Sequence, residues 1–132
     1  MNIDKIYPHT DGTAVEYPLA NGYISTTSIL FEAYGVAVTI DAAGSAAFFD
    51  RQESRLAEAR LPDADGGKEK YTEVLCAAKN AAITLKFPIV EGIDNYPNCD
   101  GEHDRWDTRT IGYHVLTFDP AAHTVKITEE KR

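Results

Sequence analysis

The chain has 132 residues, which is enough for one domain, since domains most often run to roughly 100–150 residues. Hydrophobic residues make up 43% and charged residues 26% of it, a globular composition that excludes disordered, collagen-like and disulfide-rich chains. Lysine and arginine number 13 against 21 acidic residues, so the formal net charge is −8. We therefore expect a single domain over residues 1–132 that neither binds nucleic acid directly nor associates with membranes, because both carry negative charge.

The N-terminal residues and the cysteines indicate the cellular compartment. The first residues lack a basic stretch followed by an apolar one, so they do not predict a secretory signal. Cys76 and Cys99 are too few for a disulfide framework, and we interpret each as a small buried hydrophobe. These features predict a cytoplasmic protein, and the acidic charge suits a basic protein partner.

Frequent turn signals set the fold class. Gly, Asn and Asp tolerate the positive φ of tight turns, and Pro presets the first turn position. The signals are Asp11-Gly12, Asn21-Gly22, residues 41–44, residues 65–67, Asp100-Gly101 and Asp119-Pro120. Short runs of β-branched and aromatic residues separate them, which predicts a mainly β protein, an antiparallel sandwich or barrel-like, with one or two short helices.

In chain order, residues 23–31 form the first long β-prone run. Residues 36–40 and 46–49 predict a hairpin in which Gly44 supplies the left-handed position of the connecting turn. The segment 51–61 is short, charged and closed by proline, and it gives no clear pattern. Residues 113–118 and 124–128 alternate between apolar and polar types around a turn at Asp119-Pro120, so they predict a second hairpin.

Residues 68–82 allow two interpretations. Good helix formers dominate, and Tyr71, Leu75, Ala78 and Ala82 fall on one helical face, which predicts an α+β fold with a helix at about 68–82. Alternation along 71–77 instead predicts a strand that turns near Asn80 into the strand 83–87. The β-rich surroundings favour the strand, because strands need neighbours to pair with.

The segment 91–107 has a composition of its own. It holds six acidic residues and one arginine, so its local charge is −5, and it contains Trp106, the only tryptophan. A loop of this length without apolar periodicity is uncommon in a compact domain and is often functional.

Protein binding is the leading interpretation of this segment. Tryptophan, tyrosine and arginine are the residues most enriched at interface hot spots, and carboxylates steer a basic surface towards them. The predicted partner-binding residues are Tyr96, Asp100, Glu102, His103, Asp104, Arg105, Trp106 and Asp107. The structural alternative places Trp106 in the core, with Arg105 and Arg109 pairing nearby acids.

A divalent metal is a second interpretation of the same segment. The candidate ligands are Asn98, Asp100, Glu102, Asp104 and Asp107. An EF-hand alignment with Gly101 as the sixth residue places Tyr96 at the first position, which needs a carboxylate ligand that tyrosine lacks. Only a divalent-metal site without the EF-hand pattern therefore remains. A metal-assisted hydrolase would be built on Asp100, His103, Asp104 and Asp107, and no other cofactor is expected.

The basic residues supply a third possibility. Lys68, Lys70, Lys79 and Lys86, together with Arg51, Arg55 and Arg60, could capture a small anionic, nucleotide-like ligand or support a homo-oligomer. No glycine-rich phosphate loop accompanies them. The leading prediction is therefore a non-enzymatic cytosolic interaction or inhibitor protein, in the manner of immunity or phage anti-defence proteins, that presents residues 91–107 to a basic partner.

Overall fold

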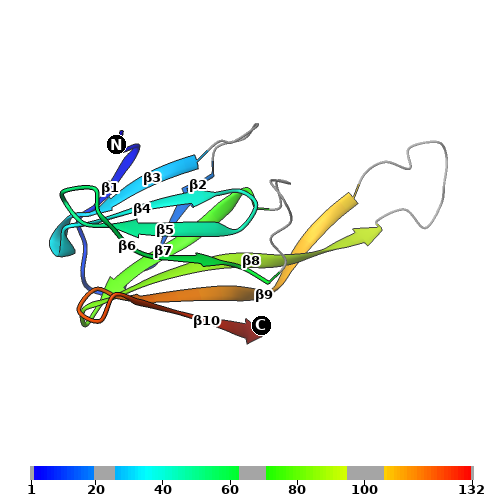
Figure 1. Ribbon diagram of the computed structural model, residues 1–132. Helices are drawn as coiled ribbons and strands as arrows, with labels where there is room; N and C mark the ends of the chain where they lie inside the picture. The colour runs from blue at the N-terminus through cyan, green and yellow to red at the C-terminus, as the bar shows by residue number, and fades with distance from the viewer. Residues whose placement is uncertain (1, 20–25, 63–70, 95–105, 132) are drawn as a thin grey trace.

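The computed structural model describes residues 2–19, 26–62, 71–94 and 106–131, with the backbone alone for 92–94 and 106–108. In these residues ten strands form two five-stranded sheets that pack face to face (Figure 1). The mainly β prediction is confirmed, and of its two forms the sandwich is the architecture observed. None of the described helices is long or apolar enough to cross a membrane.

The first sheet has the strand order β1-β3-β4-β5-β6. Its strands are β1 (Lys5–Tyr7), β3 (Thr26–Phe31), β4 (Val36–Asp41), β5 (Ser45–Phe49) and β6 (Arg55–Arg60). β1 runs parallel to β3, and the other pairs are antiparallel. A single 3₁₀ turn, Glu32–Tyr34, joins β3 to β4 and ends at Gly35, whose φ of 64° is left-handed.

The second sheet has the order β10-β9-β8-β7-β2 and is antiparallel throughout. Its strands are β2 (Val15–Pro18), β7 (Glu73–Lys79), β8 (Ala82–Asp94), β9 (Trp106–Asp119) and β10 (Thr124–Lys131). β8 and β9 are much longer than the other strands, and their ends project beyond the body of the molecule (Figure 1).

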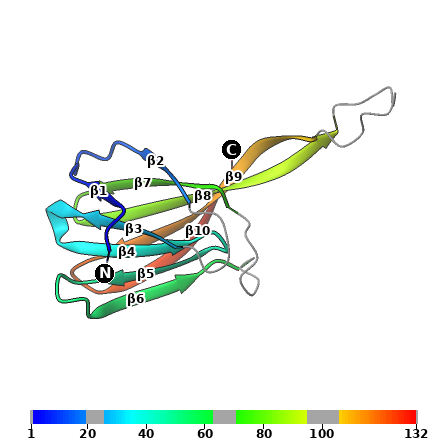
Figure 2. The same cartoon turned by 90° about the horizontal axis from the view of Figure 1, so that it is seen from above.

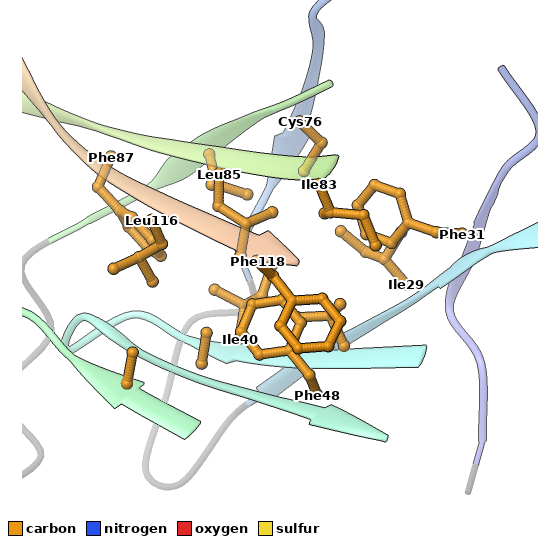
Figure 3. Close-up of a cluster of buried hydrophobic side chains, with 14 of the residues drawn as sticks. Ile29, Phe31, Ile40, Phe48, Cys76, Ile83, Leu85, Phe87, Leu116 and Phe118 are labelled. Atoms are coloured by element: carbon orange, nitrogen blue, oxygen red, sulfur yellow. The ribbon is translucent and has the colours of Figure 1, made fainter. Parts of the chain in front are cut away.

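The core lies between the two sheets and follows from the alternation of side chains along each strand. Val36, Val38 and Ile40 of β4 are buried in it. On the facing sheet, Ile83, Leu85 and Phe87 of β8 are buried in the same way (Figure 3). Phe48 of β5 stacks on Phe118 of β9 with ring centroids 4.3 Å apart. This aromatic pair joins the two sheets directly.

Backbone and ring contacts close the sandwich where the sheets meet. The N–H of Tyr71, just before β7 of the second sheet, donates to the carbonyl of Ala42 in the β4–β5 turn of the first sheet at 2.9 Å. On the β1 and β2 side, the rings of Tyr7 and Tyr17 lie 6.3 Å apart at a steep angle. These contacts fix the relative position of the sheets at both sides.

The helix predicted at about 68–82 is wrong over its described residues. Val74, Cys76 and Ala78 are buried in alternation along β7, while Asn80 and Ala81 take positive φ in the turn to β8. β7 lies between β2 and β8, so pairing on both edges outweighs the helix propensity of its residues. Residues 68–70 lie outside the described part of the chain.

The remaining strand predictions have mixed outcomes. Both predicted hairpins are confirmed, as β4–β5 and as β9–β10, and residues 26–31 of the predicted run 23–31 form β3. The unclear segment 51–61 contains β6, whose Ala46–Ala59 rung with β5 faces the core. The 3₁₀ turn is the helical element of the described residues, at a position the sequence did not indicate.

Candidate functional site: the β8–β9 arm

The feature that sets this sandwich apart is an arm made of the ends of β8 and β9. Both strands continue beyond the body of the sandwich as a two-stranded ribbon (Figures 1 and 2). Their pairing is unbroken from Val90 opposite Thr110 to Asp94 opposite Trp106. At about 3.3 Å per residue, the β8 side of the ribbon extends ~16 Å past Ile89.

A β-bulge marks the base of the arm. Ile89 pairs with Gly112 and Val90 with Thr110, so Ile111 is an extra residue of β9 without an opposite partner. A bulge bends its strand and increases the local twist. We attribute the departure of the ribbon from the plane of the sheet to this one residue.

The neighbouring strands end where the arm begins. β7 pairs with β8 as far as Leu75 opposite Lys86, and β10 pairs with β9 as far as Lys131 opposite Gly112. Beyond these points, among the described residues, β8 and β9 pair with each other alone. Within the described residues, both outer edges of the ribbon therefore carry unpaired backbone groups, which are a template for another strand.

Exposed apolar side chains lie at the base of the arm. Val90 is 51% exposed and Ile111 is 41% exposed, whereas Phe87, three residues before Val90, is fully buried. Isolated two-stranded ribbons are marginally stable in water, and exposed apolar residues add nothing to that stability. Val90 and Ile111 did not stand out in the sequence, because β-branched residues alternate through β8 and β9 alike.

One ion pair lies across the arm. The guanidinium of Arg109 contacts the carboxylate of Glu91, which pairs with it in register. Both side chains are largely exposed, so the pair adds little stability. This contact confirms that Arg109 pairs a nearby acid. Glu91 is therefore not one of the unpaired acids expected in residues 91–107.

The predicted loop over 91–107 is wrong at both of its ends. Glu91 to Asp94 belong to β8, and Trp106 and Asp107 begin β9, because the register of the body continues along the ribbon. Of the predicted partner-binding residues, only Trp106 and Asp107 have a described backbone. The others lie outside the described residues, as does Asn98: Tyr96, Asp100, Glu102, His103, Asp104 and Arg105. Their roles stay predictions.

The described part of the chain holds no group of three or more His, Cys, Asp and Glu residues suited to a metal ion. The metal and hydrolase hypotheses therefore concern the residues between the two arm strands. His114, which lies in β9 opposite Phe87 and Glu129, is a sheet histidine with an interaction of its own.

The basic residues do not gather into one cluster. Lys86, on the second sheet, contacts Glu130 at 3.1 Å and lies 5.8 Å from the ring centre of Tyr113. Arg55, on the first sheet, contacts Glu58 at 3.1 Å and lies over the ring of Phe49. Lys68 and Lys70 lie outside the described residues. The described members thus belong to separate sheets, and two of them, Lys86 and Arg55, already contact acids.

Cys76 has no feature of a reactive thiol. It is a free cysteine of β7 with no exposed surface, and burial raises the pKa of its thiol far above the ordinary value. A protonated thiol in the core is a poor nucleophile. The interpretation of Cys76 as a small buried hydrophobe is confirmed.

Comparisons with known proteins add no information on the site: no family model, no curated protein and no solved structure matches the chain. The projecting arm is therefore the feature from which a function is best argued.

Proposed function

We propose that this chain is a non-enzymatic cytosolic interaction or inhibitor protein that binds a basic protein partner through the β8–β9 arm. The observation that carries the proposal is the arm itself, a ribbon with exposed Val90 and Ile111 whose two outer edges pair with no other described strand. A hairpin with so little cover gains stability when a partner buries it.

Charge supports the choice of partner. The chain carries a net charge of −8, and residues 91–107 hold five acids besides the paired Glu91, against Arg105. Such a field raises the rate of encounter with a basic surface and disfavours acidic partners. Immunity proteins and phage anti-defence proteins are inhibitors of this general kind, and we propose that class for the chain.

Removal of the arm tests this proposal. Residues 90–111 are replaced by Asn-Gly, which closes a two-residue hairpin on the Ile89–Gly112 pair. Full chain and armless variant are each used to capture proteins from a lysate of the organism that encodes the chain. We expect a basic protein that the full chain captures and the armless variant does not, with both variants melting cooperatively. Identical captured proteins would refute the arm as the contact element.

Charge variants sharpen the test once that protein is purified. Changing Asp100, Glu102, Asp104 and Asp107 to their amides should weaken binding and flatten its salt dependence. The matched control changes four acids of the sandwich body by the same net charge: Glu32, Glu58, Glu129 and Glu130. Equal losses in both variants would mean that net charge, and not the acidic segment, governs binding.

A further inference from the structure

A hollow of about 530 Å³ lies on the outer face of the first sheet. Its lining among the described residues comes from β3, β4, β5 and β6, and its volume is in the range of small-molecule sites. The polar members of the lining are Thr26, Thr39, Asp41, Ser45, Glu58 and Arg60.

The hollow exists because the middle strand carries small outward side chains. Ala46 and Phe48 of β5 point into the core, so Ser45 and Ala47 lie on the opposite, outer face. Thr39 of β4 and Glu58 of β6 flank Ala47 in a continuous cross-strand row. The result is a furrow along β5, with walls two strand spacings or ~10 Å apart.

The two walls carry opposite charges at one end of the furrow. Asp41 ends β4 on one wall, and Arg60, which pairs with Ser45, ends β6 on the other. Oδ1 of Asp41 accepts the N–H groups of the following turn, while its second oxygen has no donor among the described residues. The guanidinium of Arg60 likewise has no hydrogen bond or ion pair with another described residue.

We propose that this furrow binds a small zwitterion, an α-amino acid or dipeptide, in addition to the protein binding proposed above. Its carboxylate contacts the guanidinium of Arg60, which suits planar bidentate pairing, and its ammonium group contacts Asp41. Ser45 on β5 supplies a hydroxyl group between them, and Thr39 supplies a second one next to Asp41 on β4. The two carboxylates of the lining, Asp41 and Glu58, make the furrow unsuited to a phosphate or nucleotide.

The test is a titration followed by the backbone amide NMR signals of Ser45 and Ala59. Glycylglycine carries both charges, glycinamide lacks the carboxylate, and N-acetylglycine lacks the ammonium group. We expect saturable shifts with glycylglycine, and about tenfold weaker binding of either analogue, the loss typical of one charged hydrogen bond. No saturable shift, or glycinamide binding as tightly as glycylglycine, would overturn the proposal.

Two variants locate the site. Ala47→Ile fills the furrow with a residue that suits an exposed strand position, and it should abolish the shifts. Ala77→Ile makes the same change on the second sheet, opposite Thr84, and should leave them unchanged. Arg60→Gln should remove the preference for glycylglycine over glycinamide while the furrow stays open. Wild-type binding by Ala47→Ile or by Arg60→Gln would refute the site.

Discussion

β8 and β9 run through both the body of the sandwich and the arm, so the two regions can be compared within the same strands. In the body, β8 has strand neighbours on both sides, and Phe87 is fully buried between the sheets. Three residues later, Val90 is 51% exposed, and among the described residues β8 pairs there with β9 alone. Burial holds the body together, whereas the arm depends on a single ladder of hydrogen bonds, which leaves its surface available to a partner.

The largest contrast between the regions should come from the core. Phe118→Ala removes a fully buried ring that stacks on Phe48 across the two sheets. We expect the free energy of unfolding, measured by urea denaturation, to fall by about 3–5 kcal/mol. Val90→Ala in the arm is the control and should change it by less than ~0.5 kcal/mol. Comparable losses from the two variants would mean that the arm is part of the folding core.

A smaller effect is expected at the β4–β5 turn. Oδ1 of Asp41 accepts the N–H groups of Ala43, Gly44 and Ser45, each at 3.0 Å, in a partly buried setting. Asp41→Ala should lower the free energy of unfolding by about 1–3 kcal/mol, because these donors lose their acceptor. Asp119→Ala, at the exposed β9–β10 turn, should cost less. The reverse order in urea denaturation would contradict this account.

The carboxyl pair on the outer face of the second sheet predicts a pH effect. A hydrogen bond that the protonated Glu73 carboxyl donates to Glu16, then partial burial and then the charge of Glu16, raise the pKa of Glu73. A carboxyl group with a raised pKa in the folded state stabilises the fold in acid and loses that contribution as the pH rises through the raised pKa.

We therefore expect Glu73→Gln to raise the melting temperature at pH 7 relative to wild type and to bring little gain near pH 4. Glu129→Gln on β10 removes the same charge at an exposed position and is the control. A Glu73→Gln gain that is equal at both pH values would show that the Glu16–Glu73 contact has no role in it.

The smallest effect on stability should come from the base of the arm. Replacing both Val90 and Ile111 by threonine keeps strand-forming residues there while removing exposed apolar surface. We expect a change below ~0.5 kcal/mol in the free energy of unfolding, since both side chains face water. Partner binding, in contrast, should weaken in a surface-binding assay. Unchanged binding would leave the unpaired edges, and not these side chains, as the contact.

Local pattern predicted the parts of the fold whose neighbours are close in sequence. The β4–β5 and β9–β10 hairpins follow from alternation and turn residues such as Gly44, which has a φ of 105°. The sequence does not distinguish strand from helix in the segments of β6 and β7. Their inward residues include alanines such as Ala59 and Ala78, which are also good helix formers. The segment 91–107, expected to be a loop, overlaps the arm, and its described ends are strands.

The sequence by itself determined the class of the protein, because strands that bury one face must alternate, and tight turns need residues that tolerate positive φ. Only the tertiary structure decided that β7 is a strand, since its two neighbours in the sheet come from distant parts of the chain. The same holds for the arm and the furrow. The arm begins where β7 and β10 end, and the furrow forms because small side chains of β5 meet longer ones of β4 and β6.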